Sequence, residues 1–195
     1  FGARDVWFVV GIPVYFYAVL SDGTVDGKRI AFFTIGIFMA VWTILYGAVQ
    51  ASAPKALRAG TRPEGELVHA ARFWALALTV VPVGLGALVL WAGEPQTWLT
   101  ATVIAGLLIF GAIFAVNSSL HSYLILAFSK GERVTMDVGF YYMANAAGRL
   151  LGTLLSGVSY QLGGLPACLF TAAAMVALSV LCVRKLEAPR AEAPA

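Results

Sequence analysis

Long apolar runs separated by short polar connections restrict the folds open to this chain more than any other feature. A membrane-crossing helix needs about 20 mainly apolar residues, and six runs meet that requirement. Their approximate ranges are 1–20, 30–57, 67–92, 98–128, 134–162 and 165–183. No strict alternation of apolar and polar residues, which is typical of barrel strands, accompanies them. The sequence therefore predicts an all-α integral membrane protein, with a six-helix transmembrane bundle in residues 1–183 and a polar, disordered tail in residues 184–195.

The composition agrees with a membrane protein and argues against a nucleic-acid-binding one. Charged residues make up 12% of the chain, about half of the roughly 25% found in soluble domains. The net charge is +3, but the basic residues are dispersed between apolar runs and form no stripe with interleaved aromatic residues. We therefore expect membrane lipid to surround the protein and expect no nucleic-acid partner.

The basic residues indicate how the helices are oriented. If the six helices alternate in direction, nine lysines and arginines lie on one side of the membrane: Lys55, Arg58, Arg62, Arg72, Lys130, Arg133, Arg184, Lys185 and Arg190. The other side carries only Lys28 and Arg29. Cytoplasmic loops are enriched in such residues, so the richer side and the C-terminus are predicted to be cytoplasmic.

Arg149 lies in the middle of an apolar stretch, GFYYMANAAGRLLGTLLSG, which runs from Gly139 to Gly157. An arginine at the centre of a membrane helix costs about 2.5–3.5 kcal/mol on insertion scales, so it requires a polar partner. Three interpretations are open: a cationic site for an anionic substrate, a buried ion pair with an acid such as Asp5, and extension of the side chain to the membrane surface. We expect the first.

The same stretch combines small and polar residues at helical spacing. A ridge that would let another helix approach closely recurs every four residues, at Ala144, Gly148, Gly152 and Ser156. Asn145, Arg149 and Thr153 form a polar stripe beside it. One face is therefore predicted to pack against a helix, and the neighbouring face to present hydrogen-bonding groups.

Two further stripes lie on other helices. In AVNSSLHSY, Asn117 and His121 are i,i+4 neighbours, which either bond to other helices or face the same interior as Arg149. Trp42, Tyr46 and Gln50 form a second i,i+4 stripe, and aromatic stripes are typical of packing. The two histidines are too far apart in sequence for the usual metal-ligand spacings, and no catalytic motif appears. We therefore expect no metal, no cofactor and no enzymatic activity.

The pattern of helices, with a basic loop after the second, resembles the C-terminal half of a major facilitator superfamily transporter. The loop GAVQASAPKALRAG keeps the glycine and basic residues of the superfamily signature but lacks its aspartate, so a general drug exporter is a weaker fit. Three stretches are similar to the organoarsenical efflux family of that superfamily, ArsJ: FGARDVWFVVGIPVYFY, NSSLHSYLILAFS and VGFYYMANAAGRLLGTLLSG.

This resemblance implies a secondary transporter of the bacterial inner membrane that works by alternating access. Its implied substrate is 1-arseno-3-phosphoglycerate, which forms when glyceraldehyde-3-phosphate dehydrogenase uses arsenate. That enzyme would be a functional partner, and an N-terminal six-helix half would be the other partner. Because the chain begins inside an apolar helix pattern, we expect that half to lie upstream of Phe1.

The implied substrate carries phosphate, arsenate and hydroxyl groups, which suit cationic and amide side chains. We expect five residues to bind it: Arg149, Asn145, His121, Asn117 and Arg4. Asp5 is expected to pair with an arginine, and either Asp5 or His121 could carry a coupled proton. The alternatives are an exporter of another small metabolite, a membrane scaffold and an intramembrane enzyme.

Overall fold

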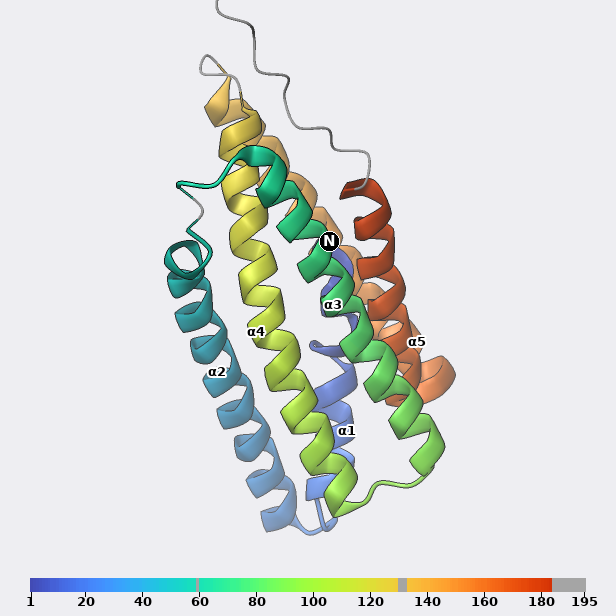
Figure 1. Ribbon diagram of the computed structural model, residues 1–195. Helices are drawn as coiled ribbons and strands as arrows, with labels where there is room; N and C mark the ends of the chain where they lie inside the picture. Colours follow the sequence, from blue (N-terminus) through green and yellow to red (C-terminus); the bar gives the residue numbers. More distant parts are fainter. Residues whose placement is uncertain (59, 130–132, 184–195) are drawn as a thin grey trace, which may run out of the picture.

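The computed structural model describes residues 1–58, 60–129 and 133–183, and the regular structure in this part of the chain is all helical, without strands (Figure 1). The prediction of an all-α protein is therefore confirmed for these residues. The helices are η1 (Gly2–Trp7), α1 (Gly11–Leu20), α2 (Val25–Ala56), α3 (Glu64–Ala92), α4 (Thr97–Phe128) and α5 (Val134–Val183). The predicted tail, residues 184–195, lies outside the described residues.

The first apolar run is a broken helix and not the single helix predicted for residues 1–20. A short 3₁₀ helix, η1, is separated from α1 by Phe8 to Val10, and the backbone at Asp5 is already non-helical, with ψ of 15°. The Ser156 hydroxyl accepts hydrogen bonds from the backbone nitrogens of Val10 (3.1 Å) and Gly11 (3.4 Å). Backbone donors in apolar surroundings need such acceptors, so Ser156 makes the break tolerable.

α2 begins five residues before the predicted position, because a polar cap starts the helix. The Thr24 hydroxyl accepts a 3.0 Å hydrogen bond from the backbone nitrogen of Gly27, and α2 follows from Val25. Threonine is a favoured residue at this position because it satisfies a backbone donor of the first turn. Lys28 and Arg29 therefore belong to the helix and not to the preceding loop.

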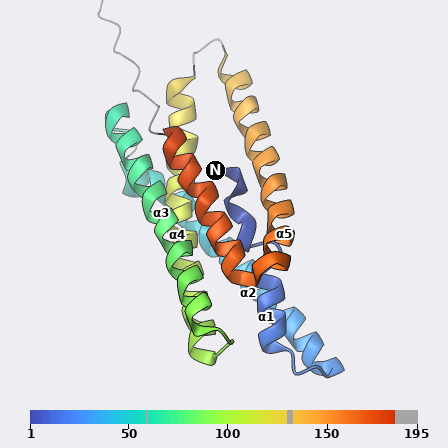
Figure 2. The same cartoon turned by 90° about the vertical axis from the view of Figure 1, so that its right-hand side faces the viewer.

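α5 is interrupted at Gly163 and Gly164, in the gap left between the predicted ranges 134–162 and 165–183. Gly164 has φ of +62°, a conformation that favours glycine. Figure 2 shows that the chain reverses direction there. We call residues 134–162 the first arm and residues 165–183 the second arm.

Five helical stretches among the described residues are long and apolar enough to cross a membrane, with η1 and α1 counted as one stretch and α5 as another. This is compatible with a multi-pass membrane protein. Six crossings, which would count the two arms of α5 separately, remain a prediction.

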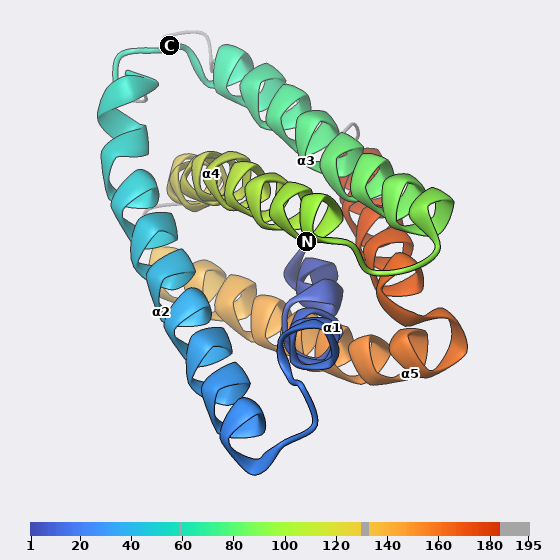
Figure 3. The same ribbon diagram turned by 90° about the horizontal axis from the view of Figure 1, so that it is seen from below.

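The helices surround η1 and α1, which lie between α2, α4 and α5 (Figure 3). The core includes Trp7, Ile12 and Phe110, whose side chains are fully or almost fully buried. Large apolar side chains cover the outer faces, and Phe32 and Phe33 of α2 are more than 60% exposed. Such extended apolar exposure marks an interaction surface, and a lipid bilayer is one that would fit.

Candidate anion site

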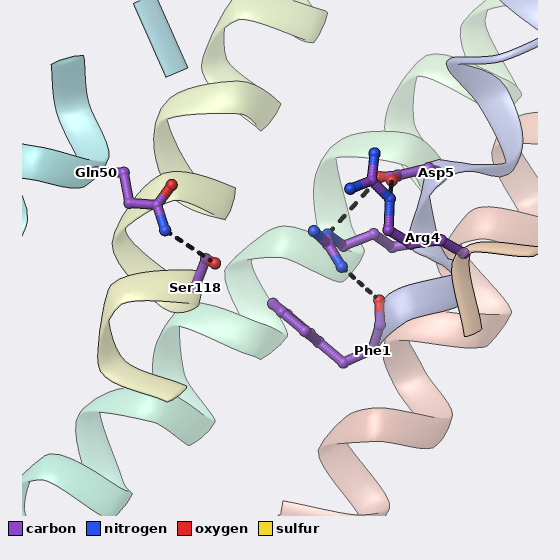
Figure 4. Close-up of polar contacts among 6 residues, drawn as sticks. Phe1, Arg4, Asp5, Gln50 and Ser118 are labelled. Carbon is purple, nitrogen blue, oxygen red and sulfur yellow. Dashed lines mark hydrogen bonds and ion pairs between the residues drawn. The ribbon is translucent and has the colours of Figure 1, made fainter. Parts of the chain in front are cut away.

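Asp5 lies between two arginines, one before it in η1 and one from the first arm of α5. The Nε atom of Arg4 is 3.7 Å from Asp5 Oδ1, and the Nε atom of Arg149 is 3.5 Å from Asp5 Oδ2. Figure 4 shows Arg4 beside Asp5 and Phe1. One carboxylate therefore contacts two guanidinium groups, and the three side chains together carry one net positive charge.

Arg4 and Asp5 both lie in the broken part of the first apolar run. Neighbouring side chains of a regular α-helix point about 100° apart. Arg4 and Asp5 are paired where the backbone of η1 departs from helical geometry, at Asp5. Broken helices of this kind carry the binding sites of many membrane transporters, because the interruption brings polar groups into the membrane region.

A cavity of about 200 Å³ adjoins the three charged side chains. It lies between η1, α2, α4 and the first arm. The remaining lining residues are Thr43 and four aromatic residues, Phe8, Trp42, Tyr46 and Phe114. The cavity therefore has a charged end and aromatic walls.

The two arginines differ in exposure. The Arg149 side chain is 66% exposed, whereas the Arg4 side chain is 6% exposed. The neighbours Leu150, Leu151 and Leu154 are also exposed, so Arg149 is a cation on an otherwise apolar outer face. Such a residue normally faces a protein interior or a water-filled cavity when it lies in a membrane.

Asn117 and His121 lie on the face of α4 that carries Phe114, but they do not line the cavity of Arg149. The His121 ring is stacked on Phe1, with ring centroids 4.4 Å apart. His121 instead lines a second cavity of about 220 Å³, together with Tyr141 and residues of α3, α4 and both arms of α5. The Asn117 side chain is fully buried, and neither its amide nor His121 Nε2 has a hydrogen-bond partner among the described residues.

Asn145, in the first arm of α5, lies beside Gly2 at the start of η1. Its Oδ1 atom is buried without a hydrogen-bond partner in the described part of the chain, and a Cβ added at Gly2 would lie 2.9 Å from that atom. The structure thus places Arg4, Asp5 and Arg149 together, whereas Asn145, Asn117 and His121 do not line the same cavity.

The small-residue ridge lies along η1 and the break. A Cβ added at Gly148 would lie 3.0 Å from the Cα of Gly2, and one added at Gly152 would lie 3.0 Å from the Ala3 oxygen. Ser156 continues the ridge with its bonds to the backbone of the break. Ala144 is exposed, because the ridge extends one turn beyond the residues that η1 covers.

The sequence patterns do not predict three of the cavity residues, and they indicate packing for two others. Phe8, Thr43 and Phe114 carry no sequence signal of a binding role. Trp42 and Tyr46 were recognised only as an aromatic stripe, and the third member of that stripe, Gln50, donates a 3.4 Å hydrogen bond to Ser118 outside the cavity (Figure 4). The described residues contain no cluster of three or more metal-ligating side chains.

Comparisons of the chain with protein-family models, with curated proteins and with solved structures found no match.

Proposed function

We propose that this chain forms one half of a secondary transporter of the bacterial inner membrane that exports a small organic anion. The observation that carries the proposal is the exposed guanidinium of Arg149, which is held by Asp5 beside a cavity at a helix break. A membrane scaffold needs no exposed cation on an apolar face, so the same observation favours transport over packing alone.

The chemistry of the three charged residues suits reversible binding of an oxyanion. A guanidinium group presents two parallel donors that match the oxygens of phosphate, arsenate or carboxylate. Between substrates, Asp5 neutralises Arg149, so that this cation is never without a partner in the membrane. An arriving anion replaces Asp5 on Arg149, while Asp5 keeps its contact with Arg4.

The proposed substrate is 1-arseno-3-phosphoglycerate, and it comes from the resemblance to the organoarsenical efflux family. One of its two oxyanion groups would bind the guanidinium of Arg149, which supplies two parallel donors. An opposing six-helix half would cover the face that carries Arg149, and the two halves would rock around the cavity to open it to each side in turn. The transporter would act downstream of glyceraldehyde-3-phosphate dehydrogenase, and its C-terminus would be cytoplasmic.

Transport can be tested in everted membrane vesicles that contain the full-length gene product. The vesicles are energised and given radiolabelled arsenate, with or without glyceraldehyde-3-phosphate dehydrogenase, glyceraldehyde 3-phosphate and NAD. We expect label to accumulate only when the enzyme and both of its substrates are present, because the organoarsenical is made only then.

Vesicles without the transporter are the control for leakage. Equal accumulation with arsenate alone would show that the substrate is arsenate and not the organoarsenical. No accumulation above the leakage control, with the protein present in the membrane, would contradict the transport function.

A further inference from the structure

Arg4 is occupied by protein groups, although some of its atoms line the cavity. Its Nη1 atom donates a 2.9 Å hydrogen bond to the backbone oxygen of Phe1, and its Nε atom faces Asp5. The central carbon of the guanidinium lies 3.5 Å from the centre of the Phe114 ring and 4.4 Å from that of the Phe1 ring. Unlike the exposed Arg149, this cation is buried among protein groups, although its Nε atom has no hydrogen-bond partner in the described part of the chain.

The Phe114 ring ends a column of three aromatic rings. Tyr46 is stacked on Phe114, with centroids 4.7 Å apart and an interplanar angle of 18°. Trp42 is stacked on Tyr46 at 5.7 Å and 4°, and its Nε1 atom donates a 2.9 Å hydrogen bond to the backbone oxygen of Leu107. The column joins α2 to α4, and its last ring, that of Phe114, contacts the guanidinium of Arg4 in η1.

We propose that Phe114 is a positioning residue for the anion site, an inference that rests on the function proposed above. Its ring holds the Arg4 guanidinium against Asp5 Oδ1, which fixes the carboxylate and directs Oδ2 to Arg149. Attraction between a cation and a ring is strongest where both are shielded from water, as Arg4 is here. Arg149 is then the arginine that exchanges Asp5 for substrate, and Arg4 keeps the carboxylate in place.

The test compares three variants of the full-length transporter: Phe114→Leu, Phe114→Tyr and Phe110→Leu. Phe110 is the matched control because it is a buried ring one turn earlier on α4, where it contacts Trp7 at 5.2 Å. The KM and maximal rate of organoarsenical uptake are measured in everted vesicles with the dehydrogenase reaction as the source of substrate. Phe114→Leu should raise KM about three- to tenfold, the size expected for loss of one shielded cation–ring contact.

Phe114→Tyr keeps the ring and should hold KM within about twofold of the wild-type value. Phe110→Leu should lower the melting temperature as Phe114→Leu does, because both remove buried ring volume, but it should leave KM within about twofold. Equal KM values in Phe114→Leu and Phe110→Leu would overturn the positioning role. If Phe114 acts through Arg4, Phe114→Leu should not raise KM further in a protein that already carries Arg4→Gln. The same rise in KM in the presence and absence of Arg4 would also overturn the positioning role.

A second measurement separates this inference from the transport function. The purified proteins are treated with the arginine reagent phenylglyoxal, and modified residues are identified by mass spectrometry. In the wild type, Arg149 should react and Arg4 should be protected; Phe114→Leu should expose Arg4, and Phe110→Leu should not. Failure of the wild type to transport would contradict the proposed function alone, whereas unchanged protection of Arg4 in Phe114→Leu would contradict the role of Phe114.

Discussion

A single carboxylate balances two cations that differ in surroundings. Asp5 contacts the buried Arg4 through one oxygen and the exposed Arg149 through the other. Removing Arg149 leaves Asp5 with Arg4, so no buried charge is left without a partner. Removing the charge of Asp5 leaves two guanidinium groups near each other, and one of them is buried. The two changes should therefore differ in their effect on folding.

We expect Asp5→Asn to destabilise the protein far more than Arg149→Gln. Breaking a buried ion pair by removing one partner costs about 3–5 kcal/mol, whereas an exposed pair contributes about 0–1 kcal/mol. The measurement is thermal unfolding of the purified variants in detergent. Equal melting temperatures for Asp5→Asn and Arg149→Gln would show that Arg4 does not depend on this carboxylate.

At the scale of helices, close packing against the first arm of α5 sets the position of η1. Gly148 and Gly152 leave room for the backbone of Gly2 and Ala3, and the hydroxyl of Ser156 satisfies the broken backbone beyond them. Asp5 therefore reaches Arg149 because small residues let the two helices approach. The packing face and the charged face are neighbours on the same helix, as their spacing in the sequence predicts.

The expected consequence is that Gly152→Ala destabilises the protein. A Cβ at this position would lie 3.0 Å from the Ala3 oxygen, and such overpacking costs about 1–3 kcal/mol. Gly157→Ala is the control, since nothing lies within 4 Å of its added Cβ, and alanine there should stabilise the helix by about 0.5–1 kcal/mol. Thermal unfolding followed by circular dichroism distinguishes the two, and equal responses would contradict close packing at Gly152.

The sequence predicted helices well where long apolar runs determine them, and less well where distant residues do. The break after η1 is invisible locally because Phe8 to Val10 are apolar, and the acceptor for its free backbone groups, Ser156, is far away in the sequence. Arg4, Asp5 and Arg149 were found because charges in apolar runs are rare. Two other features depend on which helices are neighbours: the contact of Phe114 with Arg4 and the separation of His121 from the cavity of Arg149. Local sequence patterns do not predict which helices are neighbours.

For the whole molecule, the ends of α4 provide a test of how the helices cross the membrane. Its 32 residues span about 48 Å, enough to cross the roughly 30 Å apolar core of a bilayer. Basic residues gather at the end marked by Ser129, whereas Gln96 marks the opposite end.

We therefore expect single cysteines at Ser129 and Gln96 to react from opposite sides of the membrane. All native cysteines, which include Cys168 and Cys182, are first replaced. A membrane-impermeant thiol reagent applied to intact cells should label the Gln96 position, and applied to everted vesicles it should label the Ser129 position. Labelling of both positions from one side would exclude a membrane-crossing α4.

The central claim is that Arg149 holds the anionic substrate, and organoarsenical uptake by Arg149→Gln in everted vesicles tests it most directly. Arg29→Gln is the matched control, because the Arg29 side chain is also exposed (69%) and also pairs with one carboxylate, that of Asp26 at 3.4 Å. We predict that Arg149→Gln loses uptake although the amount of protein in the membrane is unchanged. Arg149→Lys should reduce the uptake rate about tenfold, because lysine lacks the planar donor pair. Arg29→Gln should transport normally. Normal uptake by a well-folded Arg149→Gln protein would contradict the substrate-binding role of Arg149.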